Sequence, residues 1–271
     1  MADSGKLSAM PRVIAITGAS AGIGRATAVR LARDGAALAI CARRREPLDA
    51  AASEIVAAGG QALATVADVA SDADMRRFVT STVERFGRLD VMICNAGFGV
   101  AGAIDDVTPE QMRRLIDVNY MGTFFAARAA LDVFRRQHSG HLIVISSIVG
   151  KRGVPYMGAY SATKFAQVGM AECLRAEVAG SPIHVSLVYP VSTESEFFDV
   201  MSRETGTTVT RAFGPRQDAS VVADAIARAI ERPAPEVYPH PTSRALVWLN
   251  AMAPGYCDRI VKRFGRQPVR S

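Results

Sequence analysis

Cysteine, histidine and long apolar runs are all scarce in this chain, and each shortage excludes a class of protein. The four cysteines are far apart and form no Cys-x-x-Cys pair, and the four histidines show no zinc-binding spacing. A disulfide framework and a metal site are therefore not expected. No apolar stretch approaches the roughly 20 residues that cross a bilayer, and the polar N-terminus is not that of a signal peptide. We expect a cytoplasmic protein with free thiols.

Acidic residues are also in the minority, since 26 Asp and Glu stand against 32 Lys and Arg, which gives a net charge of +6. This balance can indicate nucleic acid, anionic lipid or anionic ligands as partners. The basic residues are spread along the chain, and no basic stripe is interleaved with aromatics. Nucleic-acid binding is therefore not expected. We expect a small molecule as the partner.

What the sequence does contain is a regular alternation of short apolar runs and longer helical patterns. Apolar strands separated by helices predict a parallel sheet covered on both faces. Right-handed crossovers then give an α/β fold with a doubly wound, Rossmann-type parallel sheet. We expect one catalytic domain over residues 1–241, with a polar substrate loop at about 190–214. The expected strands cover residues 13–16, 37–41, 62–67, 89–94, 141–145, 183–188 and about 236–238, and a long helix runs from 109 to about 136 after Thr108 as its N-cap.

A glycine-rich turn, Thr17-Gly18-Ala19-Ser20-Ala21-Gly22-Ile23-Gly24, follows the first expected strand and opens a helix. Its glycines let the backbone turn tightly and approach a pyrophosphate, and the helix N-terminus offers free N–H groups and positive potential. An ordinary strand-to-helix turn is the alternative, which the strand–turn–helix context disfavours. The expected dinucleotide contacts come from Gly18, Ser20, Ala21, Gly22, Ile23 and Gly24.

The residues after the second and third strands bear on cofactor choice. Ala42 stands where an NAD enzyme normally has an acidic residue for the ribose 2′-hydroxyl, and Arg43 and Arg44 follow. A guanidinium can pair with a 2′-phosphate, so the sequence predicts NADP(H) rather than NAD(H). The alternative is that these arginines only solvate a loop. Asp68 and Val69 suit the adenine ring, although Asp68 can equally be an acid at a helix N-terminus.

Tyr160 and Lys164 lie four residues apart, so on a helix they would share one face. Tyrosine is a poor acid near neutral pH, and an adjacent ammonium would lower its pKa and make it a usable proton donor and acceptor. The spacing alone is common by chance, and an exposed tyrosine beside a solvated lysine is the alternative. The glycine-rich turn upstream favours the catalytic interpretation.

Together these motifs resemble the short-chain dehydrogenase/reductase family over about residues 12–240. The resemblance rests on the glycine-rich turn, Asn95-Ala96-Gly97, Asn119, Ser146-Ser147 and Tyr160-Ser-Ala-Thr-Lys164. It implies a nicotinamide cofactor, a homodimer or homotetramer, and an active site of Asn119, Ser147, Tyr160 and Lys164, where Ser147 is chosen over Ser146 for its spacing to Tyr160. It also implies cofactor contacts from Asn95, Ala96, Gly97, Tyr160, Lys164, Pro190 and Ser195.

The resemblance further implies roles in a reversible hydride transfer between nicotinamide and a carbonyl or secondary alcohol. Tyr160 would give its proton to the carbonyl oxygen, and Ser147 would donate a hydrogen bond to the same atom. Lys164 would lower the pKa of Tyr160 and hold the nicotinamide ribose. Asn119 would position a water that connects Lys164 to solvent.

Two positions depart from the family pattern. Val191 follows Pro190 where the family has glycine, so positive φ is disfavoured there and the loop is expected to take another path. Ser195 stands for the usual threonine, with Thr193 as the nearby alternative, and Cys94 replaces the first asparagine of Asn-Asn-Ala-Gly.

Residues 242–271 form a C-terminal extension with a basic tail. Apolar residues recur in it at helical spacing, and Pro254-Gly255 should break the helix. Packing against the domain or a sister subunit is favoured. A membrane-surface segment is the sharper alternative, because Arg259, Lys262, Arg263 and Arg266 adjoin the apolar face. A lid over a hydrophobic substrate is a third.

Two other functions compete for the whole chain. One is a nicotinamide-binding regulator without catalysis, and the other is a peripheral membrane reductase of lipid-like ketones. An apolar substrate pocket is suggested by Phe98, Val154, Tyr156, Phe197 and Phe198, although core packing explains these residues as well.

Overall fold

Seven parallel strands form the centre of the protein, in a computed structural model that describes residues 11–206 and 216–264. Their order is β3-β2-β1-β4-β5-β6-β7. The order reverses between β1 and β4, which is the switch point where ligands bind in such sheets. The predicted doubly wound fold is therefore confirmed. The strands are β1 Val13–Thr17, β2 Ala37–Ala42, β3 Gln61–Val66, β4 Val91–Cys94, β5 Gly140–Ile145, β6 Ile183–Val188 and β7 Glu236–Val237.

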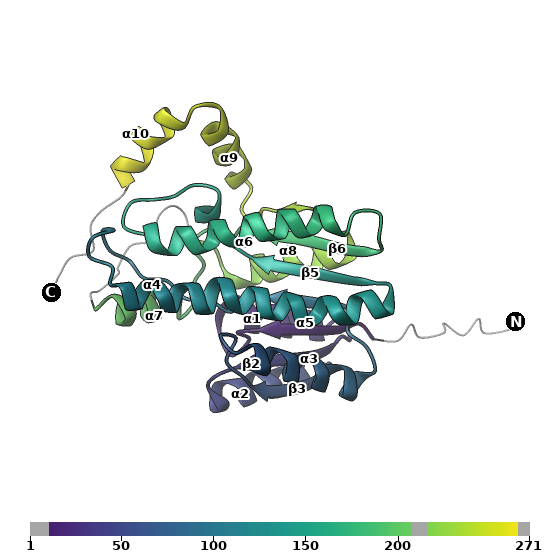
Figure 1. Cartoon of the computed structure of the whole chain (residues 1–271). Helices are drawn as coiled ribbons and strands as arrows, with labels where there is room; N and C mark the ends of the chain where they lie inside the picture. The colour runs from purple at the N-terminus through teal and green to yellow at the C-terminus, as the bar shows by residue number, and fades with distance from the viewer. Residues whose placement is uncertain (1–10, 207–215, 265–271) are drawn as a thin grey trace, which may run out of the picture.

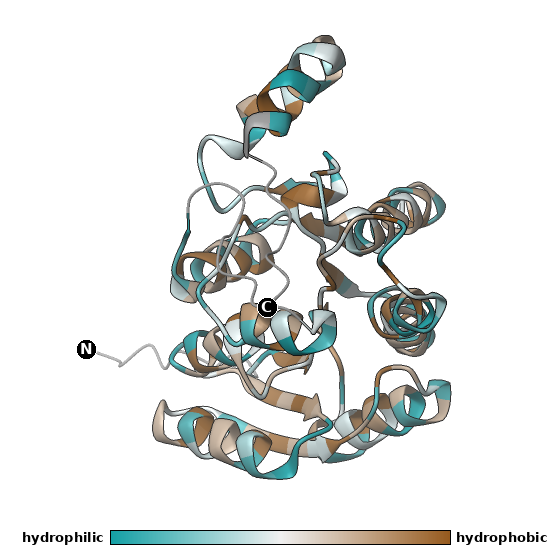
Figure 2. Ribbon diagram, turned by 90° about the vertical axis from the view of Figure 1, so that its left-hand side faces the viewer, coloured by the Kyte–Doolittle hydropathy of each residue, from teal (hydrophilic) through white to brown (hydrophobic). Residues whose placement is uncertain are grey.

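Helices cover both faces of this sheet (Figure 1). Side chains alternate between the two faces along each strand, so Ile14 and Ile16 join one buried cluster while Ala15 joins the other. Figure 2 shows the same division, with brown apolar segments turned toward the sheet and teal polar ones toward solvent. One face is covered by α1 Gly22–Ala32, α2 Arg45–Ala57 and α8 Ala219–Glu231, and the other by α3 Asp72–Phe86, α5 Gly122–Gln137 and α6 Gly158–Glu177.

The long helix predicted between β4 and β5 is interrupted by a π-helical segment. It consists of α4 Pro109–Leu115, the π-helical η1 Ile116–Met121 and α5. Thr108 is its N-cap as predicted, because its hydroxyl accepts from the Gln111 N–H at 3.2 Å while the Gln111 side chain accepts from the Thr108 N–H at 2.9 Å. π-Helical turns are rare and concentrate at functional sites, and this one contains Asn119.

The last two helices stand away from the sheet, beside β6 and α6 (Figure 1). They are α9 Ser243–Met252 and α10 Pro254–Phe264, so the chain breaks at the predicted proline. Two short elements, the 3-10 turn η2 Ile148–Gly150 and α7 Phe197–Thr205, flank the same end of the molecule. Residues 207–214 of the expected substrate loop, and Arg266 with the rest of 265–271, lie outside the described residues.

The hydrogen bonds explain where β4 and α8 begin. Residue 89 does not begin β4, because the Asp90 carboxylate instead accepts from the Val13 N–H at 2.8 Å and fixes the start of the neighbouring strand. Helix α8 begins at Ala219, since the Asp218 carboxylate caps the Ser220 N–H at 2.7 Å. Gln217 precedes that cap and pairs through its backbone with the loop after β6.

Candidate active site

The glycine-rich turn joins β1 to α1 at the switch point of the sheet. Gly18 and Gly22 have φ values of +66° and +55°, a region that L side chains rarely adopt. A Cβ at Gly18 would lie 2.7 Å from the Cα of Ala96. The N-cap, Ala21, makes no side-chain cap, and the first turn of α1 holds no acidic residue. The first N–H groups of α1 are thus left for an anion, which fits a dinucleotide pyrophosphate.

Asn95 holds this turn against the end of β4. Its Nδ2 donates to the carbonyl oxygens of Thr17 and Gly18, each at 3.0 Å. The Thr17 hydroxyl accepts from the N–H groups of Asn95 and Ala96 at 3.0 and 3.1 Å. A Cβ at Gly24 would lie 2.5 Å from Asn95 Nδ2, so glycine is required for this approach. The predicted contact residues Asn95 and Ala96 are therefore hydrogen-bonded to the end of β1 and lie next to the glycine-rich turn.

The two arginines predicted to select the cofactor differ in their surroundings. Arg43 is exposed and makes no hydrogen bond or ion pair with any described residue. Arg44 pairs with Glu196, at 2.7 Å between Nη2 and Oε2. The segment that carries Glu196 folds back over the glycine-rich turn, where a Cβ on Gly22 would lie 3.0 Å from the Cβ of Ser195.

The adenine-side residues are tied into the start of α3. Asp68 accepts from the Ala70 N–H at 3.0 Å through Oδ1, and its own N–H donates to Asp74 at 2.9 Å. This backbone hydrogen bond is the main reason why the pKa of Asp74 is lowered. Val69 is buried, and a Cβ at Gly122 would lie 2.8 Å from its side chain. A local structural role for Asp68 thus stands beside the predicted adenine contact.

The loop after β6 supports the serine segment. The Pro190 carbonyl accepts from the Ile148 N–H at 3.0 Å and faces the Ser147 hydroxyl at 3.5 Å. Val191 keeps a negative φ as predicted, because His138 and Tyr156 are the only described residues other than glycine with positive φ. Pro190 therefore lies at the active-site end of the sheet and orders the turn that carries Ser147.

Ser147, Tyr160 and Lys164 come together as the sequence predicted. Tyr160 and Lys164 both lie on α6 and are 7% and 3% exposed. Lys164 Nζ lies 5.7 Å from the centre of the Tyr160 ring, and Ser147, the residue that precedes η2, lies close enough to lower the pKa of the Tyr160 phenol. This places a phenol, a hydroxyl and an amine beside the glycine-rich turn.

The expected direction of the Tyr160 pKa is wrong for this structure. Burial raises that pKa above its ordinary value, and the hydrogen bond with Ser147 opposes the rise. Burial also lowers the pKa of Lys164 to about 7. Lys164 Nζ donates to the Ile145 carbonyl at 2.9 Å and to Gln167 at 3.1 Å, so its predicted effect on the phenol stays a prediction.

Asn119 is completely buried and all its hydrogen-bonding groups are used. Its side chain accepts from the Phe98 N–H and donates to the Phe98 carbonyl and the Thr163 hydroxyl, each at 3.0 Å. Its backbone carbonyl accepts from the Thr123 hydroxyl and from Gln167 Nε2, both at 2.7 Å. Both lone pairs of that oxygen are thereby occupied. The predicted water between Asn119 and Lys164 would therefore compete with Thr123 and Gln167 for this carbonyl.

An apolar cluster surrounds Tyr160 on its other side. The Phe197 ring lies 5.5 Å from the Tyr160 ring, and Phe98 and Val154 belong to the same buried cluster. Tyr156 and Phe198 do not belong to it. The C-terminal helices contribute to this Tyr160 cluster, which comprises Phe98, Val100, Leu115, Ile148, Val149, Val154, Ala159, Tyr160 and Val261, with Leu246 and Val247 packed against it.

Comparison with known proteins decides the family. The profile described as short chain dehydrogenase matches residues 12–205. The chain belongs to the short-chain dehydrogenase/reductase family. It is 36% identical over 223 residues to "Uncharacterized oxidoreductase Lin0452" of Listeria innocua, a match that covers 79% of this chain and 90% of that protein.

Solved structures agree with this assignment. A short chain dehydrogenase/reductase from Burkholderia phymatum in complex with NAD has the same fold, with a TM-score of 0.82 and 24% identity over 96% of this chain and 97% of that chain. An alcohol dehydrogenase from the archaeon Thermococcus sibiricus, complexed with 5-hydroxy-NADP, has a TM-score of 0.74 and 28% identity over 84% and 95%. This short-chain dehydrogenase/reductase is therefore an oxidoreductase with a nucleotide-binding fold.

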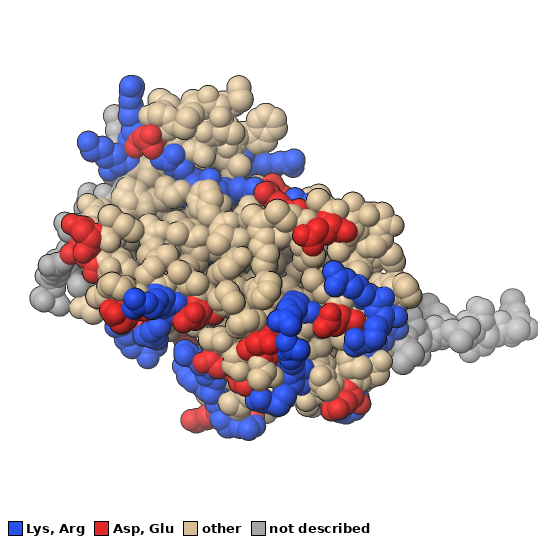
Figure 3. All heavy atoms as spheres, viewed as in Figure 1, with Lys and Arg blue, Asp and Glu red and all other residues tan. Residues whose placement is uncertain are grey.

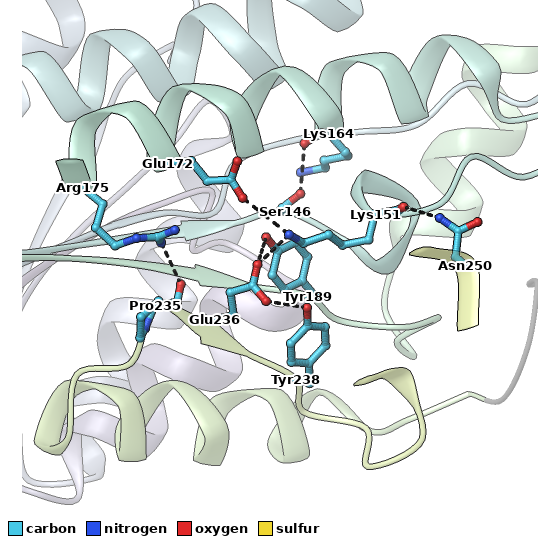
Figure 4. Close-up of polar contacts among 10 residues, drawn as sticks. All are labelled: Ser146, Lys151, Lys164, Glu172, Arg175, Tyr189, Pro235, Glu236, Tyr238 and Asn250. Atoms are coloured by element: carbon cyan, nitrogen blue, oxygen red, sulfur yellow. Dashed lines mark hydrogen bonds and ion pairs between the residues drawn. The ribbon is translucent and has the colours of Figure 1, made fainter. Parts of the chain in front are cut away.

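A polar cluster that the sequence did not suggest ties the C-terminal helices of this dehydrogenase/reductase to the active site (Figure 4). Lys151, just after η2, pairs with Glu236 at 2.5 Å, and its ammonium lies 5.0 Å from the centre of the Tyr189 ring. The Lys151 carbonyl accepts from Asn250 of α9 at 3.5 Å. Arg152 donates to Asn250 at 3.0 Å and pairs with Asp258 of α10. The segment that begins at Ser147 is thus held from above by α9 and α10.

Within the described ranges, no helix is both long and apolar enough to traverse a bilayer. The residues that the structure describes contain no group of three or more His, Cys, Asp or Glu side chains arranged for a metal ion. All four cysteines are free, and Cys173 alone among them is exposed.

Proposed function

We propose that this oxidoreductase transfers a hydride between NADP(H) and a carbonyl or secondary alcohol carbon, with Tyr160 as acid and base. The observation that carries the proposal is the placement of Ser147 beside Tyr160, with Lys164 on the same face of α6, next to a glycine-rich turn that leaves the N-terminus of α1 uncapped. When bound, the nicotinamide supplies or accepts the hydride.

The side chains then have distinct tasks. In reduction, Tyr160 donates its proton to the substrate oxygen, and Ser147 donates a hydrogen bond to the same oxygen. A buried phenol with a raised pKa keeps its proton until negative charge develops on that oxygen. Lys164 offers its remaining N–H to the nicotinamide ribose, and Asn119 fixes the loop at Phe98 that borders the site. The backbone of Gly18, Ser20, Ala21, Gly22, Ile23 and Gly24 would hold the pyrophosphate, and Asn95, Ala96, Gly97, Pro190 and Ser195 would contact the rest of the cofactor.

The preference for NADP(H) follows from the end of β2. Ala42 brings no carboxylate, and the exposed guanidinium of Arg43 has no partner among the described residues. A 2′-phosphate there would gain a charge-assisted hydrogen bond, and Arg44 would add a second by leaving Glu196. The NADP-type ligand of the Thermococcus relative supports this choice. Asp68 and Val69 flank the expected adenine position.

An apolar small-molecule substrate is the class that suits the Tyr160 cluster. Phe98, Val154 and Phe197 supply apolar surface beside the reacting phenol, and Val261 of α10 closes the cluster. The C-terminal helices are then part of the substrate site rather than a separate module. We further propose a cytoplasmic homodimer or homotetramer, because Phe124 and Phe165 are 38% and 45% exposed on the outer helices.

A peripheral membrane reductase of lipid-like ketones is the second candidate. Trp248, Met252 and Tyr256 on α9 and α10 are 66%, 79% and 56% exposed. Figure 3 shows Lys and Arg side chains grouped around these helices at the top of the molecule. Exposed aromatic and apolar side chains beside basic ones are typical of segments that lie on anionic lipid.

The test is a panel of carbonyls and alcohols followed at the NADPH absorbance band, with NADPH and NADH compared. The proposal predicts turnover with a higher kcat/KM for NADPH, and a ratio that narrows or reverses in Arg43→Asp. Nicotinamide binding without turnover across the panel would instead favour a non-catalytic regulator. Deletion of residues 242–271 followed by oligomer sizing and lipid flotation separates the roles of the extension.

A further inference from the structure

Gln167 fills the space between Lys164 and the π-helical segment. It lies on α6, one helical turn after Lys164, and is completely buried. Its Oε1 accepts from Lys164 Nζ at 3.1 Å, and its Nε2 donates to the Asn119 carbonyl and to the Thr123 hydroxyl, both at 2.7 Å. Asn119 is fully buried and Thr123 and Lys164 are each 3% exposed. One neutral side chain thus connects the active-site lysine to η1 and α5.

The chemistry of the partners fixes which way round this amide lies. The Lys164 ammonium can only donate and the Asn119 carbonyl can only accept. The Thr123 hydroxyl gives its single hydrogen to the Asn119 carbonyl at 2.7 Å, so it must accept from Gln167. A reversed amide would place its NH2 group against the Lys164 ammonium, donor against donor. It would also place its oxygen against the Asn119 carbonyl, acceptor against acceptor. The observed orientation is therefore the one that satisfies every group.

These contacts close one proton route. The Asn119 carbonyl has two lone pairs, which Thr123 and Gln167 occupy. A carboxamide neither gains nor loses a proton near neutral pH, so Gln167 cannot pass one between Lys164 and the helix. The path through Asn119 that the family resemblance implies is replaced by a fixed amide.

The same contacts aim the lysine. An ammonium has three N–H groups. Two of those of Lys164 donate, one to the Ile145 carbonyl and one to Gln167, on the same side of Nζ. On the other side lie the Tyr160 ring, 5.7 Å from Nζ, and Gly97, whose Cβ, if present, would be 3.7 Å from Nζ. The third N–H group is therefore directed toward the phenol and the expected nicotinamide ribose.

We propose that Gln167 is a positioning residue that holds the Lys164 ammonium toward Tyr160 and the cofactor, and that the Asn119 carbonyl, which Gln167 and Thr123 occupy, does not carry protons to Lys164. The proposal rests on the proposed function for its catalytic consequence, but the contact itself can be tested without a substrate.

The surroundings of Lys164 make its titration a clean measure of this contact. Tyr160, on the same helix, is the one titratable side chain placed against it among the described residues. The other contacts are neutral: β5 supplies the Ile145 carbonyl, and α6 supplies Gln167, behind which η1 and α5 supply Asn119 and Thr123. Burial already lowers the pKa of Lys164 to about 7. Loss of an acceptor that stabilises the charged form should lower it further.

The first experiment compares Gln167→Leu with Gln137→Leu by NMR of protein labelled with 13C at the lysine ε carbon. Gln137 is a matched control, because its amide also bridges buried backbone groups, the Leu89 N–H at 3.0 Å and carbonyl at 2.8 Å, far from the site. The chain has only four lysines, so the four signals can be assigned. We expect the pKa of Lys164 to fall by about one unit in Gln167→Leu and to stay unchanged in Gln137→Leu. An unchanged Lys164 titration in Gln167→Leu would overturn the proposal.

Gln167→Glu covers the case in which Gln167→Leu does not fold. It keeps the size of the side chain and places a carboxylate beside the ammonium, so the pKa of Lys164 should rise instead of falling. No rise would also overturn the proposal. If the variants show these shifts but the wild-type enzyme turns over no carbonyl, the proposed function is refuted and the positioning role stands.

The proton route is tested separately by kinetics. Gln167→Ala opens a polar space between Lys164 Nζ, the Asn119 carbonyl and the Thr123 hydroxyl that can take a water. We expect the solvent isotope effect on kcat of this variant to differ from that of the wild type. The isotope effect of Gln137→Ala should equal that of the wild type. Identical isotope effects and pH profiles in Gln167→Ala and the wild type would contradict the claim about the route.

Discussion

Replacing Glu196 with Gln tests the cofactor preference, because the contact between Glu196 and Arg44 allows the change in the Kd of NADPH to be estimated. The Glu196 carboxylate pairs with Arg44 at 2.7 Å, and both side chains are half exposed, at 50% and 51%. An exposed ion pair of this kind stabilises by about 0.2–1 kcal/mol. A 2′-phosphate that binds Arg44 must displace the carboxylate, so Glu196→Gln should lower the Kd of NADPH by roughly 1.4-fold to 5-fold. NADH carries no 2′-phosphate, and its Kd should not change.

Fluorescence titration of each variant with NADPH and NADH at low and high salt measures this effect. Asp199→Asn is the control, because Asp199 is exposed in the first turn of α7, the helix that Glu196 precedes, and its replacement removes the same charge without breaking a pair to Arg44. The gain in NADPH affinity should shrink at high salt, as expected for exposed charges. Equal changes in Glu196→Gln and Asp199→Asn, or a parallel gain for NADH, would refute the competition between Glu196 and a 2′-phosphate.

Three further predictions concern stability and substrate binding. Burial lowers the pKa of His141 to about 4 from 6.5. The stability that its neutral form provides is therefore complete above pH 6.5 and is lost as the pH falls toward 4, by up to about 3 kcal/mol. Urea unfolding at pH 4 and pH 6.5 should show a smaller loss of stability in His141→Asn than in the wild type. Thr108→Ala should reduce the free energy of unfolding by about 1 kcal/mol through loss of the capping box, while Glu110→Gln, in the exposed first turn of the same helix, serves as the control. Val261→Asp, which places a charge in the Tyr160 cluster, should raise KM for apolar ketones and leave the Kd of NADPH unchanged, and equal effects on both would argue that α10 does not line the substrate site.

Local patterns in the sequence were sufficient to predict the fold and the proximity of Tyr160 and Lys164. Apolar runs separated by helical patterns predict a parallel sheet because both faces of its strands are buried, and the glycines of the turn are required by φ values of +66° and +55°. The four-residue spacing of Tyr160 and Lys164 places both on one face of a helix regardless of tertiary context.

Features that depend on long-range packing could not be predicted in this way. The pKa of Tyr160 moves opposite to the expectation because burial raises it by more than the interaction with Ser147 lowers it. The role of Gln167 depends on a π-helical turn that presents the Asn119 carbonyl to α6. Its position three residues after Lys164 was a usable signal, since such residues are neighbours on a helix.

Tyr160→Phe tests the central claim most directly, because it removes one hydroxyl and little volume. Pre-steady-state measurement of NADPH oxidation with a ketone that the wild type reduces gives the rate, and fluorescence titration gives the Kd of NADPH for both proteins. We predict an unchanged Kd and a rate lower by roughly 10²-fold to 10⁴-fold, the range for loss of a general acid. A Tyr160→Phe enzyme that reduces the ketone at a rate near that of the wild type would contradict the account.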